Sequence, residues 1–158
     1  YEPTHIVDNI YLGNAYNASN YTCLSEKNIS FIVNITEEIP NYYSDDIEYY
    51  NIIIKDSNDS NIKTYLNNTI ELLRTKYLES KISDKNIKPN ILVHCFMGSS
   101  RSATLVIAYL MKYHHLSVDE ALQKCKKLRP LVNINTTFYQ DLKIWSESEL
   151  KNDNNLLE

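Results

Sequence analysis

ILVHCFMGSSRSATLVIAYLM, residues 91–111, is the stretch that decides the fold. It opens with three apolar residues of high β propensity and reaches His94 and Cys95, which is typical of a short buried strand. A small polar turn with Gly98 follows, and from residue 101 to residue 113 the chain is apolar nearly all round, which predicts a fully buried helix. A buried strand, a tight loop and a buried helix in succession place Cys95 at the end of a strand.

Short β-rich segments and helix-periodic segments surround this stretch. The predicted strands are THIV (4–7), NIYLG (9–13), FIVNI (31–35), YYNIII (49–54) and NILVHC (90–95). Helical spacing of apolar residues recurs in 62–80, in 118–128 up to Pro130, and around Phe138, Leu142 and Trp145. This order predicts an α/β fold with a central mixed, largely parallel sheet of about five strands and helices on both faces. In such sheets ligands bind at the carboxyl ends of strands, where Cys95 lies.

Composition limits the functional classes. The chain has 158 residues, 43% hydrophobic and 23% charged, as in an ordinary globular domain. Its net charge of −4 provides no basic surface for nucleic acid and no polybasic membrane patch. Because no repeat or linker is evident, we expect one domain over residues 1–150 and a polar tail over 151–158. The chain starts at Tyr1 rather than Met, so we expect it to be excised from a longer protein.

Three cysteines, Cys23, Cys95 and Cys125, lie far apart in the sequence. Their odd number and spacing argue against a disulfide framework and against a zinc site, and they favour an intracellular compartment, cytoplasmic or nuclear. Most lone cysteines are buried core thiols, and we expect this of Cys23 and Cys125. The same interpretation of Cys95 leaves Gly98 and Arg101 unexplained.

The residues around Cys95 form a pattern suited to an anion. Loop amides and the start of a helix point to one place, with the positive end of the helix dipole behind them. Gly98 is one of only two glycines in the chain, and Arg101 offers a planar fork for a phosphate-like dianion. A thiol in this field ionises readily and becomes a nucleophile for phosphoryl transfer. His94, next to the thiol, is expected to hold the loop and favour the thiolate.

HCFMGSSRS contains Cys-x5-Arg, and in this context it resembles the signature of the cysteine-based protein tyrosine phosphatases. The longer run VHCFMGSSRSATLVIAYLM is similar to the small dual-specificity phosphatases. The resemblance extends to HIVDNIYLGNAYNA, FIVNITEEIP and LRPLVNINTTFYQDLKIWSESEL, and so covers roughly residues 5–150. It implies a protein tyrosine phosphatase-like fold with no metal and no cofactor.

The resemblance also implies a role for each residue of the motif. Cys95 attacks phosphorus and forms a cysteinyl-phosphate. The phosphate oxygens bind to the Arg101 side chain and to the backbone of the loop: Cys95, Phe96, Met97, Gly98, Ser99, Ser100 and Arg101. Ser102 hydrogen-bonds the sulfur and makes it a better leaving group. Asn135 is expected to tie the catalytic loop to its support, although Ile134 stands where the family often has Pro.

An acid is needed to protonate the leaving oxygen and then to activate water. The family places an aspartate after the strand that precedes the long helix, and Asp56 directly follows YYNIII. Asp59 is the alternative, but its position just before Ile62 also suits a helix N-cap. We expect Asp56 to be the acid.

Short length and loop composition favour phosphorylated proteins as substrates. The chain lacks the insertions that deepen the pocket of the larger tyrosine-specific enzymes, which implies a site open to phosphotyrosine, phosphoserine and phosphothreonine. The loop has no Lys and no second Arg. Inositol-lipid phosphatases of this superfamily often carry such residues there. Three alternatives remain: a catalytically inactive phosphoprotein-binding module, an RNA 5′-phosphatase and a phosphoinositide phosphatase. The basic residues Lys124, Lys126, Lys127 and Arg129 are expected to form a solvated helix face.

Overall fold

Five strands form one mixed sheet in the computed structural model, which describes residues 2–150. The strands are β1 (Thr4–Val7), β2 (Ile10–Gly13), β3 (Ile29–Asn34), β4 (Glu48–Asn51) and β5 (Asn90–His94). Their order across the sheet is β1-β2-β5-β3-β4. β1 pairs antiparallel with β2, and the other three pairings are parallel. The prediction of a mixed, largely parallel sheet of about five strands is confirmed.

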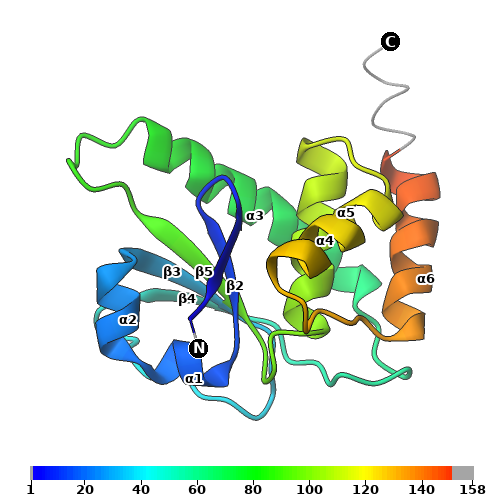
Figure 1. Ribbon diagram of the computed structural model, residues 1–158, viewed down its shortest axis with the longest axis horizontal. Helices are drawn as coiled ribbons and strands as arrows, with labels where there is room; N and C mark the ends of the chain where they lie inside the picture. Colours follow the sequence, from blue (N-terminus) through cyan, green and yellow to red (C-terminus); the bar gives the residue numbers. More distant parts are fainter. Residues whose placement is uncertain (1, 151–158) are drawn as a thin grey trace.

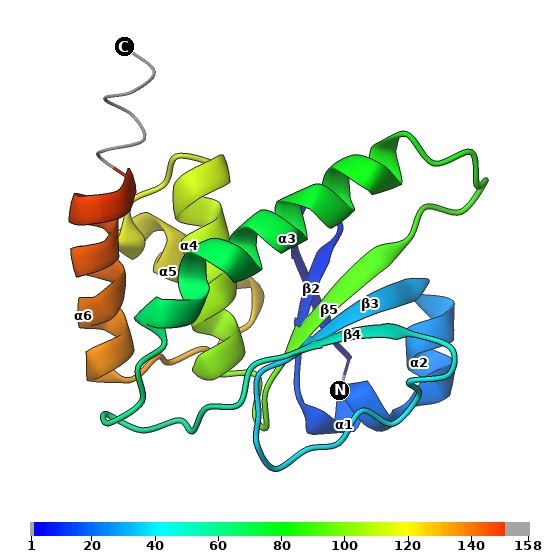
Figure 2. The same ribbon diagram turned by 180° about the vertical axis from the view of Figure 1, so that it is seen from behind.

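Helices cover both faces of the sheet, as predicted (Figure 1). The two short helices α1 (Ala15–Ser19) and α2 (Tyr21–Glu26) lie on one face. The other face carries α3 (Lys63–Lys81), α4 (Arg101–Tyr113), α5 (Val118–Leu128) and α6 (Thr136–Trp145), the last continued by a π-helical turn, Ser146–Leu150. Figure 2 shows α3 running across the sheet, with α4 between it and α5.

Successive side chains of the central strands point to opposite faces of the sheet, and each face has its own apolar cluster. In β5, Ile91 and Val93 pack with α3–α6, whereas Leu92 packs with Leu24 of α2. Every residue of α4 up to Met111 is buried, as its apolar sequence predicted. This arrangement fixes both elements that flank residues 95–100, because β5 is central in the sheet and α4 is enclosed by other helices.

Three details differ from the prediction. The short helices α1 and α2 were not predicted, since five or six residues show no periodicity; their N-caps are Asn14 and Asn20. β4 ends at Asn51, so the apolar residues 52–54 lie beyond the ladder. The N-cap of α3 is Ile62, with no side-chain cap hydrogen bond, so Asp59 is not the cap.

The carboxyl ends of β3 and β5 lie side by side, with Asn34 opposite His94 in the register. The loops that leave these ends therefore meet at one edge of the sheet. Within residues 2–150, every helix is too short or too polar to cross a membrane. The predicted tail, 151–158, lies outside the described residues.

Candidate active site

Residues 95–101, called the 95–101 loop below, connect β5 to α4. The carbonyl groups of residues 95–99 face the surrounding protein. Four residues donate five hydrogen bonds to these carbonyls: His94 Nδ1 to Cys95 O (3.1 Å), Ala15 N to Phe96 O (3.0 Å), Arg129 Nη2 to Met97 O (3.5 Å), Arg129 Nε to Gly98 O (3.1 Å) and Asn133 N to Ser99 O (2.8 Å). The amides of residues 96–101 donate no hydrogen bond to any group in residues 2–150. Since unpaired amides are costly, the loop is built to receive an acceptor from outside.

Gly98 is needed for this shape. Its φ of +71° lies in the left-handed region, which other residues adopt at a cost. A Cβ at this position would lie 2.5 Å from the carbonyl oxygen of Gly13 and 2.8 Å from Arg129 Nη2. The two glycines of the chain therefore lie against each other, where the 95–101 loop passes the end of β2.

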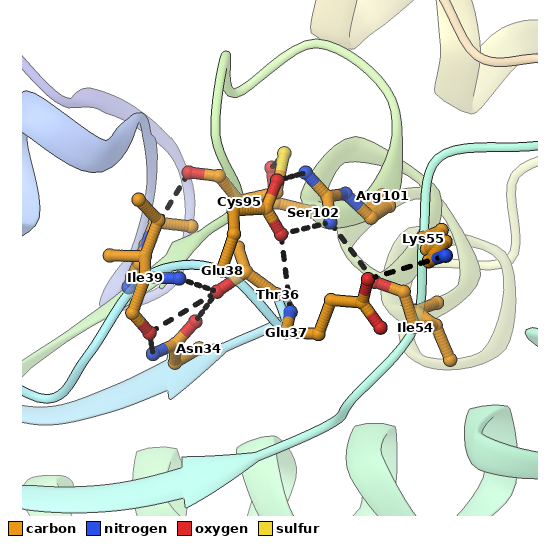
Figure 3. A network of polar contacts seen from close by, with 11 residues as sticks. Asn34, Thr36, Glu37, Glu38, Ile39, Ile54, Lys55, Cys95, Arg101 and Ser102 are labelled. Atoms are coloured by element: carbon orange, nitrogen blue, oxygen red, sulfur yellow. Dashed lines mark hydrogen bonds and ion pairs between the residues drawn. The ribbon is translucent and has the colours of Figure 1, made fainter.

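Cys95 lies beneath the start of α4. Its thiol is 2% exposed, and its Sγ is 3.1 Å from Ser102 Oγ (Figure 3). The N-cap residue of α4, Ser100, makes no side-chain cap hydrogen bond to the helix. Its Oγ instead accepts from Asn135 N at 3.2 Å, so the first turn of α4 keeps free amides and the positive end of its dipole.

Arg101 is held by a residue that the sequence analysis did not single out, Glu38. Nη1 and Nη2 donate to the two carboxylate oxygens of Glu38 at 3.0 and 2.9 Å, and Nη1 also donates to Ile54 O at 3.0 Å (Figure 3). The Arg101 side chain is only 5% exposed. Its Nε is buried with no partner among the described residues, which leaves one edge of the guanidinium available to a ligand.

The turn that carries Glu38 is fixed by polar contacts at the end of β3. Asn34 Nδ2 donates to Ile39 O at 2.8 Å, Thr36 Oγ1 donates to Asn34 Oδ1 at 2.7 Å, and Ile39 N donates to Thr36 Oγ1 at 3.0 Å (Figure 3). The hydrogen bonds from Arg101 lower the pKa of Glu38, so its carboxylate is ionised at neutral pH. Glu38 therefore neutralises Arg101 and also orients it.

Asp56 and Asn135 are in contact, a pairing that the sequence did not predict. Asn135 Nδ2 donates to Asp56 Oδ1 at 2.9 Å, while the Asn135 backbone amide donates to Ser100 Oγ. Asn135 thus connects the 95–101 loop to Asp56 although Ile134 replaces the usual Pro. Asp59 is exposed and has no hydrogen bond or ion pair with any described residue.

Burial and nearby acidic groups act in opposite directions on the pKa of Arg101. Burial acts to lower its pKa, but the hydrogen bonds from Arg101 to Glu38 outweigh this and raise it overall. The negative charges of Cys95 and Asp56 raise it further. The geometry agrees with this, because Arg101 donates to Ile54 O, two residues before Asp56, and Asn135 contacts both Asp56 and Ser100 of the loop.

His94 is fully buried and neutral. Burial lowers its pKa to about 4, which outweighs the hydrogen bond between Nδ1 and Cys95 O. Because a carbonyl only accepts, Nδ1 carries the proton and the ring is neutral at pH 7. His94 therefore supports the loop through a hydrogen bond to the Cys95 backbone, and the positive potential at the thiol comes from α4 and Arg101.

The buried His94 makes folding stability depend on pH. Between pH 6.5 and about 4 the unfolded chain binds a proton that the folded chain excludes, so stability falls as pH falls through this window. The loss reaches about 3 kcal/mol at the acid end. His94→Asn is expected to flatten the pH dependence of the free energy of unfolding between pH 4 and 6.5, measured by urea titration. His115→Asn, at an exposed position, is the control; equal slopes in both variants would contradict the prediction.

Arg129 corrects one expectation. It was grouped with a solvated basic face, but it is only 6% exposed and its guanidinium donates to Met97 O, Gly98 O and Thr4 Oγ1. The error arose because neighbouring lysines at helical spacing made the segment look uniformly polar.

The other two cysteines lie away from the 95–101 loop in the sequence. Cys125 is buried, and burial raises its pKa to about 12. Cys23 is half-buried, and burial also raises its pKa. The core interpretation suits Cys125 best.

Comparison with known proteins supports the resemblance. The family model described as "Dual specificity phosphatase, catalytic domain" matches residues 10–148. Protein phosphatase Slingshot of Drosophila melanogaster is 37% identical over 145 residues, 91% of this chain but 13% of Slingshot. Dual specificity protein phosphatase 1 of Arabidopsis thaliana is 32% identical over 140 residues, 89% of this chain and 67% of the relative. The chain thus spans only a small part of Slingshot.

Solved structures agree with this assignment. The crystal structure of DUSP15 is 30% identical and has a TM-score of 0.84, with 96% of this chain and 94% of that chain covered. The segment that the family model matches runs from the start of β2 into the turn that follows α6. With the Cys-x5-Arg loop, these matches show that the chain belongs to the dual-specificity phosphatase family.

Proposed function

We propose that this domain removes phosphate from phosphotyrosine and from phosphoserine or phosphothreonine in proteins, through a cysteinyl-phosphate intermediate. The observation that carries the proposal is the 95–101 loop. Its amides have no partner in the described chain, the first turn of α4 is uncapped, and the buried Nε of Arg101 is unpaired. A phosphate dianion supplies acceptors for all three sets of donors at once.

The first step transfers the phosphoryl group to sulfur. The Cys95 thiolate forms a bond to phosphorus while the bond from phosphorus to the ester oxygen breaks. The leaving oxygen takes a proton from Asp56, which lies beside Asn135 at the same edge of the sheet. Arg101 and the loop amides bind the three non-bridging oxygens, whose charge they stabilise throughout.

The second step releases phosphate. Asp56, now ionised, takes a proton from a water molecule whose oxygen attacks phosphorus. The bond between sulfur and phosphorus breaks, and Cys95 leaves as a thiolate. Ser102 Oγ, 3.1 Å from Sγ, donates a hydrogen bond to the departing sulfur and lowers the barrier of this step. No step requires a metal or a cofactor.

Activity toward small and protein substrates tests the proposal. We expect vanadate-sensitive hydrolysis of an aryl phosphate by the domain. Initial rates are then compared on phosphotyrosine and phosphothreonine peptides, a phosphoinositide in vesicles and a 5′-phosphorylated RNA. Turnover of both peptides supports the proposal. Binding of phosphopeptide with no turnover of any substrate would favour a phosphoprotein-binding module, and turnover of only the lipid or the RNA would replace the substrate class.

A further inference from the structure

Four large apolar side chains stand exposed around the 95–101 loop, and we call them the apolar rim: Tyr16, Phe96, Met97 and Leu131. Their exposed fractions are 62%, 50%, 59% and 46%. Isolated exposed apolar residues are common, but several around one site indicate contact with a partner.

Backbone contacts hold the rim on three sides of the loop. Tyr16 follows Ala15, whose amide donates to Phe96 O at 3.0 Å. Leu131 lies between Arg129 and Asn133, which donate to the carbonyls of Gly98 and Ser99. Phe96 and Met97 belong to the loop itself. The backbone at these four positions is therefore held close to the loop that would bind the phosphate.

The cationic groups beside the loop are each paired with a group of this chain. Lys55 lies 3.6 Å from Glu37. Arg101 is paired with both oxygens of Glu38, and Arg129 is buried and bound to loop carbonyls. Asp56, exposed at the same edge, adds negative charge. Arg129 therefore presents no free charge to a second phosphate, Arg101 keeps only its Nε edge for the phosphate in the loop, and the positive charge of Lys55 is partly offset by Glu37.

We propose that the apolar rim selects protein segments with a single phosphorylated residue flanked by large apolar side chains. This inference rests on the proposed function, since it assumes that a phosphorylated residue enters the 95–101 loop. The phosphate satisfies the loop amides and Arg101, and the neighbouring apolar side chains of the substrate cover the rim. The rim offers only apolar or negative groups to other anions near the phosphorylated residue. It therefore disfavours acidic flanking residues, a second phosphate and an anionic membrane surface.

Matched phosphotyrosine peptides test the selection. Peptides of one sequence carry Leu, Ala or Glu on both sides of the phosphotyrosine, and a fourth adds a phosphothreonine two residues away. We expect kcat/KM to be about tenfold higher for the Leu peptide than for the Ala peptide. For the Glu peptide and the doubly phosphorylated peptide, kcat/KM should be lower than for the Ala peptide. The Leu131→Ser and Tyr16→Ser variants should lose most of the Leu preference while aryl phosphate turnover stays unchanged.

Leu78→Ser is the matched control, because Leu78 is 49% exposed and lies near the end of α3, from which the chain leads to the start of β5, whereas the 95–101 loop leaves the end of β5. It should keep the full preference. Equal kcat/KM for the Leu, Ala and Glu peptides overturns the rim proposal, as does faster turnover of the doubly phosphorylated peptide or of phosphoinositide vesicles. These outcomes leave hydrolysis of the aryl phosphate and of the phosphopeptides intact, whereas failure of the proposed function removes turnover of the phosphopeptides.

Discussion

Cys95→Ser is expected to reduce hydrolysis of an aryl phosphate by at least about 10⁴-fold, because the nucleophile of a covalent mechanism is removed. A serine hydroxyl at this position stays protonated at neutral pH and does not attack phosphorus. The remaining donors are untouched: the amides of residues 96–101, the first turn of α4 and the Arg101 guanidinium. The variant should therefore still bind a phosphotyrosine peptide, measured by calorimetry, while its steady-state turnover falls to the buffer rate.

Ser102→Ala provides a matched control that touches the same sulfur atom. Ser102 is fully buried with its hydroxyl 3.1 Å from Sγ, and in the proposed mechanism it assists only the second step. Loss of a hydrogen bond to a charged group slows that step by roughly 10- to 100-fold. Rapid mixing should then show a burst of aryl alcohol equal to the enzyme concentration, followed by a slower steady rate. Residual turnover of Cys95→Ser near the wild-type rate would contradict the nucleophile assignment.

The place of the candidate site in the fold was predictable because its residues are adjacent in the sequence. Cys95, Gly98, Arg101 and Ser102 lie within eight positions, between two apolar runs that predicted β5 and α4. Backbone geometry alone brings these residues together, since a strand, a short loop and a helix leave few alternative arrangements. The structure places Cys95 and Ser102 in contact and leaves the loop amides unpaired, as an anion site requires.

The residues that support the loop were not predictable in the same way. Glu38 and Arg129 act at sequence separations of 63 and 31 residues from the groups they bind. Each belongs to a common residue type in a polar segment, so neither differs locally from a solvated charge. Burial decides the role of Arg129, and burial of a charged residue depends on tertiary packing that periodicity does not report.

Asp56→Asn tests the acid of the mechanism and should have its largest effect on poor leaving groups. We expect kcat for a phosphothreonine peptide to fall by about 10²- to 10⁴-fold, the usual contribution of a positioned general acid. The fall should be much smaller for p-nitrophenyl phosphate, whose leaving group needs little protonation. The asparagine keeps an oxygen that accepts from Asn135 Nδ2, so the loss reports the missing proton rather than a displaced loop.

The pH profile gives the sign of this effect. The wild-type profile of kcat/KM should be bell-shaped, because Cys95 must be ionised and Asp56 protonated. Activity lost as the pH rises reflects ionisation of the acid, so Asp56→Asn should flatten the basic limb and leave the acidic limb in place. Asp59→Asn is the control, three residues away on the same loop and without a partner among the described residues. A flattened basic limb in Asp59→Asn, with a normal bell in Asp56→Asn, would move the acid to Asp59 and leave the contact between Asn135 and Asp56 as a purely structural one.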